Sequence, residues 1–347
     1  MPGVQMELNI ARQRANILGG TYVQGWACLL PSARTAHAVG AFPLETFLSY
    51  LIKKGITLMK PTGLKDKALP DLRQIPDDGF AMTTAEPWVR HKVQLVRQYL
   101  VAFASAMAGQ VDEIVFVDLY ARNGLCCLGA KKDVFPGIPL MALQQDLPIS
   151  RFVLCESDAE QSRVLKIRTN KYFKDKNVML LRGKPEGLMD KIKMYVPQPR
   201  KDHKVATFCV ADAFGLEPGH GFIRELCDFG FTFLVPFTFH LGRKIDYRFY
   251  LGQERKKLSR FLGGDDGLSE KNIAGNSVFY KLLVQTWKDK MEGLGMNTAS
   301  SAHKLDSGLM EVPSYSIGLC TKTLSAKAIQ FDALAGGHVQ FALFNKN

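Results

Sequence analysis

Apolar residues in the middle of the chain fall into short runs separated by longer stretches with helical spacing. The apolar runs cover residues 114–118, 151–156, 177–181, 205–212 and 231–235, and the helix-compatible stretches include 159–173, 186–195 and 221–228. Strands that are buried on both faces are apolar along their length, and they alternate with helices where neighbouring strands are parallel. The pattern therefore predicts an α/β fold whose parallel sheet is covered by helices on both faces.

A longer amphipathic stretch precedes the first apolar run. Its apolar residues recur at steps of four and three and define a single stripe: Val89, Val93, Val96, Leu100, Phe103 and Met107. One such stripe is typical of a helix that packs against a large apolar surface. Thr84 is a candidate cap and Pro87 suits a first turn, so we expect this helix to run from about Thr84 to Gly109.

The remaining segments are assigned around this core. We expect residues 1–84 to form an N-terminal extension and residues 85–347 to form the α/β domain. Within the domain we expect a basic, mostly helical insertion after the fifth strand, at about 239–304. The other predicted elements are an inserted loop at 126–148, strands at 314–320 and 338–344, and a helix at 326–335.

Composition narrows the class of protein. Hydrophobic residues make up 46% and charged residues 22% of the chain, as in proteins with an ordinary buried core. The chain has no apolar run of about 18 residues and no signal-peptide pattern at its start, so we expect a cytoplasmic protein without a membrane partner. The cysteines lack the paired spacing of a zinc site, and Cys155 and Cys209 lie in apolar runs where buried thiols are usual.

Positive charge is concentrated in two stretches. The net charge is +12; residues 163–201 hold twelve basic and three acidic residues, and residues 241–260 hold seven and two. Such stretches favour nucleic acid as a partner, although a solvated helix face is about equally consistent with a lysine-rich stretch. The candidate nucleic-acid-binding residues are Arg243, Lys244, Arg248, Arg255, Lys256, Lys257 and Arg260.

Acidic residues end three of the predicted strands. Asp118, Glu156 and Asp212 occupy these ends, where an open α/β sheet binds its ligand. The turn after Asp118 contains Gly124, which gives a ligand close access to the backbone. Glu156 suits the position that accepts hydrogen bonds from ribose hydroxyls, although 38 residues separate it from Asp118 instead of the usual ~20. A helix cap at Asp118 and a surface acid at Glu156 are the structural alternatives.

Six short motifs, in order, resemble those of the three-Cys-motif partner (TcmP) proteins. Typical members read Lys-His-Lys, Asp-Leu-Phe-Ala-Gly-Pro-Gly, Gly-Ser-Pro-Leu, Glu-Lys-Asp and Asp-Pro-Phe-Gly. The corresponding segments here span 88–92, 117–124, 137–140, 155–158 and 211–215, followed by 260–264. The similarity covers about residues 85–325. It implies a Rossmann-like fold of the class I methyltransferase type, S-adenosylmethionine as the ligand, and a protein partner with a three-cysteine motif.

The resemblance implies roles for individual residues. The residues expected to hold the cofactor are Asp118, Ala121, Gly124, Glu156 and Gly183. Asp212 and Phe214 would position the acceptor, as the acid and the aromatic ring do in amino-methyltransferases; a helix cap and a core aromatic are the alternatives. Three positions depart from the family pattern and favour a protein that binds without catalysing: Arg122, Lys184 and Ala213.

Three functions are consistent with these residues. The first is an S-adenosylmethionine-dependent methyltransferase that acts on nucleic acid. The second is a catalytically inactive methyltransferase fold that serves as a nucleic-acid-binding or partner-docking subunit. The third is a metal-dependent nuclease that uses the three strand-end acids.

Overall fold

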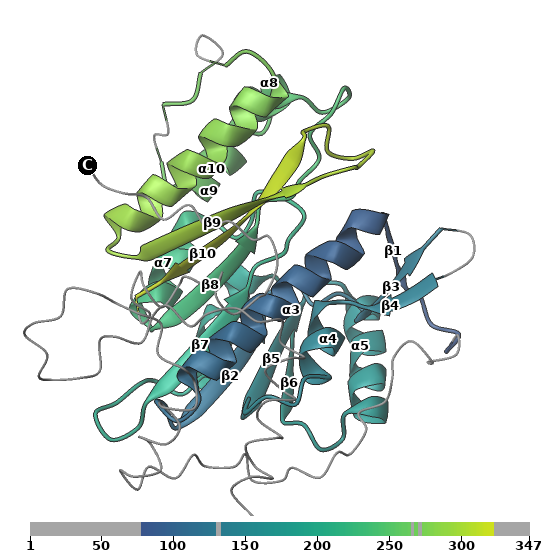
Figure 1. Ribbon diagram of the computed structural model, residues 1–347, viewed down its shortest axis with the longest axis vertical. Coiled ribbons are helices and arrows are strands. Elements are labelled where there is room, and N and C mark those ends of the chain that lie inside the picture. The colour runs from purple at the N-terminus through teal and green to yellow at the C-terminus, as the bar shows by residue number, and fades with distance from the viewer. Residues whose placement is uncertain (1–77, 130–132, 265–266, 270–272, 323–347) are drawn as a thin grey trace, which may run out of the picture. The chain divides into compact units, whose positions relative to one another are not determined.

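The computed structural model describes residues 78–129, 133–264, 267–269 and 273–322. A seven-stranded sheet runs through these residues in the order β6-β5-β2-β7-β8-β10-β9 (Figure 1). The strands are β2 (Glu113–Asp118), β5 (Arg151–Glu156), β6 (Val178–Arg182), β7 (Val205–Val210), β8 (Phe231–Pro236), β9 (Asn297–Lys304) and β10 (Ser314–Thr321). The first five strands of that order are parallel, whereas β10 runs antiparallel to both of its neighbours.

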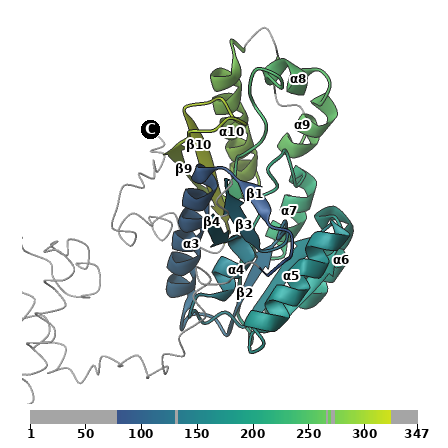
Figure 2. The same ribbon diagram turned by 90° about the vertical axis from the view of Figure 1, so that its right-hand side faces the viewer.

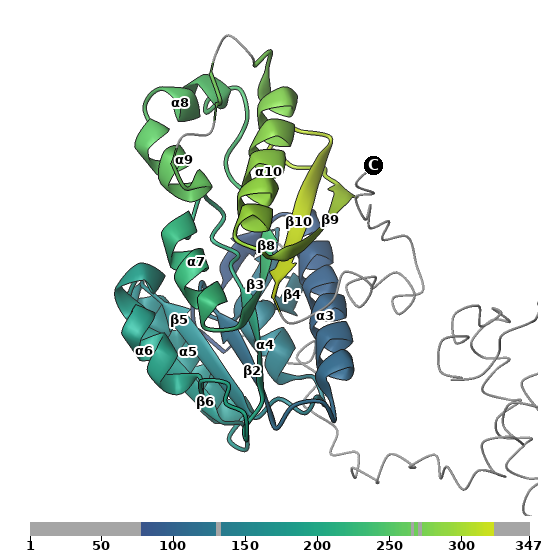
Figure 3. The ribbon, with the colours of Figure 1, turned by 90° about the vertical axis from the view of Figure 1, so that its left-hand side faces the viewer.

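Helices cover both faces of the sheet. They include α3 (Pro87–Met107), α4 (Ile138–Leu143), α5 (Ala159–Tyr172), α6 (Met189–Tyr195) and α7 (His220–Asp228). Figures 2 and 3 show α3 on one face and α7 on the other. All six residues of β7 and all six of β8 are buried, which explains why each strand is apolar except for one threonine.

The order of the strands fixes where a ligand can bind. From β2 the chain moves outward to β5 and β6, and it then returns to β7 on the other side of β2 before continuing to β8. The direction of winding therefore changes between β2 and β7. In open α/β sheets the ligand crevice lies outside the carboxyl ends of the strands at such a switch point.

The helix before the sheet is confirmed, but its predicted start is wrong. The five apolar residues from Val93 to Met107 in the predicted stripe are buried, and Val89 is half-buried. The helix begins at Pro87 with Glu86 at its cap position, and no side chain among the described residues caps it. Thr84 instead lies in β1 (Thr83–Ala85), because the backbone there pairs with another strand and is extended.

A small second sheet replaces part of the predicted loop at 126–148. It has the order β1-β3-β4, with β3 at Leu125–Leu128 and β4 at Asp133–Pro136. Helix α4 follows directly. The strands of this sheet are only three or four residues long, so they leave little periodicity in the sequence. Residues 1–77 lie outside the described residues, and the division of the chain into domains stays a prediction.

The segment after β8 contains helices and one strand. The helices are α8 (Tyr247–Leu251), α9 (Arg255–Leu262) and α10 (Asn276–Gly293), as predicted for the insertion. The assignment of 297–304 to that helical insertion is wrong, because these residues form the edge strand β9. Its buried positions are small or polar residues, namely Ala299, Ser301 and His303, so no apolar alternation marks the strand. The predicted elements at 326–335 and 338–344 lie outside the described residues.

The strand order and the antiparallel β10 define a Rossmann-like α/β fold of the methyltransferase type. The predicted thiols Cys155 and Cys209 are buried and free. No helix in the described part of the chain combines the length and the apolar character needed to cross a membrane.

Candidate functional site

Asp118 ends β2 at the switch point and is almost fully buried, with 1% of its surface exposed. Its Oδ1 atom accepts a hydrogen bond from the backbone N–H of Tyr120 at 3.0 Å. Its Oδ2 atom is buried and has no hydrogen-bond partner within the described residues. Burial, together with the nearby charges of Asp212 and Glu156, raises the pKa of Asp118 to about 7. An unpartnered buried carboxyl oxygen is unusual in a folded protein and marks the carboxyl end of β2 as a candidate site.

Glu156 ends the neighbouring strand on the same side of the sheet. The register pairs Asp118 with Leu154, so Glu156 lies two residues further along β5 and faces the same way. Its Oε2 accepts the backbone N–H of Arg122 at 2.7 Å, and its Oε1 accepts the N–H of Asp158 at 2.7 Å. Each carboxylate oxygen keeps a second acceptor position. Glu156 therefore connects two crossover loops while retaining the capacity to bind hydroxyl groups.

Arg122 adopts a backbone conformation that is usual for glycine. Its φ is +53°, in the left-handed region that favours glycine. The preceding residue, Ala121, is buried and donates its N–H to the carbonyl of Cys155 at 2.9 Å. The turn therefore has a glycine-like backbone at a residue other than glycine.

Gly124 and Gly183 both lie close to leucine side chains, which leave little room for a Cβ atom. A Cβ atom on Gly124, whose φ is +88°, would lie 2.8 Å from Leu140 Cγ and 3.0 Å from Leu165 Cδ1. A Cβ on Gly183 would lie 3.2 Å from Leu188, and its N–H donates to the carbonyl of Glu156 at 3.0 Å. Close packing accounts for both glycines without a ligand.

Asp212 follows β7 and forms a buried ion pair with Lys92 of α3. The Lys92 Nζ atom lies 2.8 Å from Asp212 Oδ1 and 2.6 Å from Oδ2, and both side chains are at least nine-tenths buried. Lys92 also lies over the ring of Trp88, 5.2 Å from its centroid. The predicted acceptor-binding acid is thus neutralised by a lysine that our sequence analysis did not select as a site residue.

Phe214 presents an aromatic ring beside this pair. Its φ is +50°, another left-handed position occupied by a residue other than glycine. The ring meets that of His240 at 4.9 Å in a T-shaped arrangement and lies 6.4 Å from the ring of Trp88. Phe214 is half-buried and His240 is exposed, so part of the aromatic group faces solvent. Strained backbone of this kind is common at functional sites.

The predicted sequence motifs contain two further site residues. Lys92 ends the segment 88–92, and Tyr120 lies in the loop after β2. The Tyr120 hydroxyl is buried and finds no hydrogen-bond partner among the residues that the structure describes. Burial raises its pKa, and the charges of Glu186 and Glu217 raise it further. Both residues lie within the predicted motifs, but the contacts that Lys92 and Tyr120 make involve segments that are distant in the sequence.

The predicted basic residues form a group on α9 and another before and within α8. Near α9, a hollow of about 550 Å³ is lined by Arg255, Lys256, Ser259, Arg260, Gly263 and Gly264. A second hollow of about 320 Å³ lies between Glu217, Lys256, Lys257 and Arg260. Lys256 and Arg260 line both hollows, so the two hollows adjoin along α9.

The other basic residues are placed differently. Arg243 and Lys244 are exposed in the segment before α8, and Arg248 pairs with Asp246 at 2.7 Å. In the first basic stretch, Arg168 cannot contact phosphates, because it is buried and pairs with Asp78 at 2.9 Å. Net charge alone therefore overstates the basic surface of that stretch.

The three strand-end acids do not form a metal site in the described segments, where no three histidine, cysteine or acidic side chains are grouped to hold an ion. Asp212 is bound to Lys92 instead. A metal-dependent nuclease that uses these three acids would therefore lack its third carboxylate ligand.

Comparisons with known proteins extend only to the fold. No family model and no curated protein matches the chain. Among solved structures, a protein from Legionella pneumophila str. Philadelphia 1 is similar over 70% of this chain and 91% of its own, with 10% identity and a TM-score of 0.43. An O-methyltransferase from Bacillus cereus in complex with SAH is similar over 80% and 99%, with 11% identity and a TM-score of 0.36.

The methyltransferase domain of METTL16 is similar over 72% of this chain and 75% of its own, with 11% identity and a TM-score of 0.38. Likenesses this distant carry no argument about chemistry. The fold class rests on the strand order and winding of the chain itself. The resemblance to the three-Cys-motif partner proteins stays a prediction.

Proposed function

We propose that this protein binds S-adenosylmethionine at the switch point and transfers its methyl group to a nucleic acid. One observation carries the proposal: the buried Oδ2 atom of Asp118, which has no partner within the described residues, at the carboxyl end of β2. Desolvating a carboxyl group without a partner is costly, so such an atom calls for a ligand. In this strand order, that ligand is an adenosyl compound or a nucleotide.

The surrounding residues fit such a cofactor. Glu156 retains acceptor positions for ribose hydroxyls, and the loop through Arg122 has the backbone shape of a glycine turn. The Tyr120 hydroxyl supplies a second polar group in the same loop. S-adenosylmethionine, when bound, supplies a methyl group activated by its sulfonium. The protein contributes by fixing the orientation of the acceptor and excluding water.

The aromatic group beside Asp212 suits a planar acceptor. Phe214 and His240 offer rings at the edge of the site, on which an unstacked base can lie. Lys92 holds the Asp212 carboxylate with both oxygens engaged, so Asp212 is fixed in position before any acceptor binds. The basic residues around α9 would contact phosphates and contribute a salt-dependent share of the affinity.

Calorimetric titration with S-adenosylmethionine tests the cofactor assignment. We expect micromolar binding that is lost in Glu156→Ala and weakened in Asp118→Asn, because these side chains would accept hydrogen bonds from the cofactor. Glu160→Gln is the matched control, since Glu160 is an exposed acid near Glu156 that pairs with Arg163. Absence of binding by the wild-type protein, with its fold intact, would refute the assignment.

Anisotropy titration with fluorescein-labelled single-stranded RNA and DNA tests the acceptor class. Changing Lys256 and Arg260 to Gln should weaken binding and reduce the salt slope by about one for each phosphate that is no longer neutralised. Arg97→Gln is the control, because Arg97 is an exposed arginine on α3 that bonds to Gln145. Equal affinity of the wild-type protein and the α9 variant at low salt would argue against this surface.

A catalytically inactive, nucleic-acid-binding subunit is the second candidate. The observation that favours it is the ion pair of Asp212 with Lys92, which engages both carboxylate oxygens that an acceptor amine would use. Nucleic-acid binding without S-adenosylmethionine binding would support this function. In either case we propose a protein partner with a three-cysteine motif, as the resemblance implies, and co-purification with such a protein tests it.

A further inference from the structure

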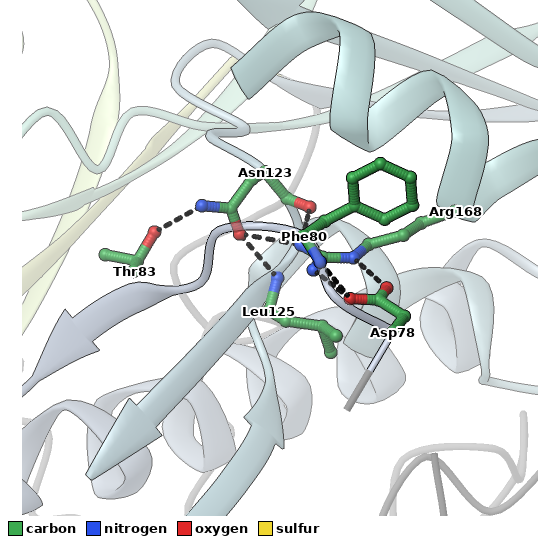
Figure 4. A network of polar contacts seen from close by, with 6 residues as sticks. All are labelled: Asp78, Phe80, Thr83, Asn123, Leu125 and Arg168. Carbon is green, nitrogen blue, oxygen red and sulfur yellow. Dashed lines mark hydrogen bonds and ion pairs between the residues drawn. The ribbon is translucent and has the colours of Figure 1, made fainter. Parts of the chain in front are cut away.

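Asn123, in the middle of the loop after β2, is held from both sides by buried polar contacts (Figure 4). Arg168 on α5 donates from its Nη1 atom to the carbonyl of Asn123 at 2.8 Å and to its Oδ1 at 3.0 Å. Oδ1 also accepts the N–H of Leu125 at 3.1 Å, and Nδ2 donates to Thr83 Oγ1 at 3.2 Å. The Asn123 side chain is 3% exposed, so these contacts replace water at this residue.

The segment that precedes α3 supplies the counterion of this network. Asp78 forms a two-pronged pair with Arg168, in which Nε lies 2.9 Å from Oδ2 and Nη2 lies 2.9 Å from Oδ1. The Arg168 guanidinium holds the pKa of Asp78 below its usual range. Both side chains are more than nine-tenths buried. A planar guanidinium can meet Asp78 and Asn123 at once, which a lysine cannot.

The network lies next to the strained residue of the cofactor loop. Arg122, with its positive φ, donates its N–H to Glu156 and is followed directly by Asn123. A left-handed residue other than glycine costs about 1 kcal/mol or more, and it persists only where its neighbours fix it. The neighbours that fix it here are α5 and the segment 78–85, whose strand β1 pairs with β3 immediately after the loop.

We propose that Asp78, Thr83 and Arg168 are positioning residues that clamp Asn123 and thereby hold the cofactor loop in its binding shape. The segment 78–85 is then part of the cofactor site although it precedes the sheet. This inference rests on the proposed function for the identity of the ligand, but the effect on the loop does not. Removing the clamp should free the loop and weaken S-adenosylmethionine binding without changing the ligand-contacting residues.

Hydrogen exchange of the full-length chain, read by mass spectrometry, tests the clamp without any ligand. In Asp78→Asn the peptide covering 119–128 should exchange about tenfold faster, because the charge-assisted pair with Arg168 is broken, while the peptide from β7 stays protected. Thr83→Val is the milder variant, since it removes one hydrogen bond and keeps the side-chain shape. Glu160→Gln, which breaks an exposed pair on the same helix α5, is the control and should change neither peptide.

Calorimetry on the same variants provides the second readout. We expect the Kd for S-adenosylmethionine to rise about tenfold in Asp78→Asn and less in Thr83→Val. Unchanged exchange of the loop in both variants overturns the inference. Equal acceleration of exchange in the loop and in β7 also overturns it, because the pair of Asp78 with Arg168 would then stabilise the whole domain and not the loop in particular. A mobile loop with unchanged affinity also overturns the role in binding. If the wild-type protein binds no S-adenosylmethionine while the loop responds as expected, the proposed function fails and the clamp stands.

Discussion

The Nζ atom of Lys92 lies 2.6 Å from Oδ2 of Asp212 and joins α3 to the loop after β7 across 120 residues of sequence. Thr238 adds a weak contact to Oδ1 at 3.5 Å. Because both charges are buried, each depends on the other for its solvation. The pair therefore fixes the acid of the predicted acceptor motif to the helix that carries the first motif.

Breaking this pair should be strongly destabilising. Lys92→Met leaves a buried carboxylate without a partner, and we expect it to lower the free energy of unfolding by about 3–5 kcal/mol. Asp212→Asn should have a similar effect, and the double variant should cost less than the sum of the two. Urea denaturation of the four proteins gives the coupling energy directly. Additive effects would show that the two side chains do not depend on each other.

Asp118 should make the protein less stable as the pH rises. Its pKa is about 7 in the folded protein and near 3.8 in the unfolded chain, so the folded state binds the extra proton between these values. Its contribution to stability is complete below pH 4 and is lost as the pH passes 7, at a cost of at most about 4 kcal/mol. Asp118→Asn should remove this loss, which urea denaturation at pH 5 and pH 8 would show.

The same carboxyl group links binding to pH. A cationic ligand beside Asp118 favours its ionised form, so binding should release a proton and tighten as the pH rises through 7. Titrations in two buffers with different ionisation enthalpies measure the proton released per ligand bound. Identical apparent enthalpies in the two buffers would contradict the link.

Parts of the fold that depend on buried apolar runs could be predicted from the sequence. The strands that end at Asp118 and Glu156, and the strand that ends two residues before Asp212, are examples, and their ends identify one edge of one sheet. Contacts that depend on distant segments could not be predicted. In the sequence, Lys92 cannot be distinguished from any other lysine on an amphipathic helix, because its partner Asp212 lies 120 residues away.

Small residues and local strain also escaped the sequence patterns. Strand β9 buries Ala299 and Ser301, whose short side chains do not mark a strand. Arg122 is not a residue type that predicts a left-handed conformation, yet its backbone adopts one, with its N–H bonded to Glu156 and the next residue, Asn123, held by Arg168. Residue type predicts such a conformation poorly when neighbouring contacts impose it.

Gly124 should be needed for packing, with or without a cofactor. Gly124→Ala places a Cβ atom 2.8 Å from Leu140 Cγ, and Leu140 is fully buried, so we expect about 1–3 kcal/mol of crowding beyond the cost of the left-handed backbone. Gly109→Ala is the matched control, because Gly109 has φ +74° and open space at its Cβ. Thermal unfolding of Gly124→Ala with Leu140→Ala should show less than additive loss, and full additivity would argue against crowding.

His303 should oppose Asp118 in the dependence of stability on pH. Its Nε2 atom lies 2.7 Å from the Ser301 hydroxyl, and burial, together with His91 nearby, lowers its pKa to about 4. Between pH 6.5 and 4 the unfolded chain binds a proton that the folded protein does not, so stability falls as the pH falls, by on the order of 1 kcal/mol after allowing for screening.

The two groups titrate over overlapping pH ranges with opposite signs, so His303 should offset part of the stability that the wild-type protein loses through Asp118 between pH 5 and pH 7. His303→Gln leaves Asp118 unopposed, and we expect this variant to lose stability as the pH rises over that range. Asp118→Asn leaves His303 unopposed and should gain stability over the same range. Urea midpoints measured at pH 5, 6 and 7 should therefore fall with rising pH in His303→Gln and rise in Asp118→Asn, with the wild-type protein between them. Parallel curves for the three proteins would contradict both assignments.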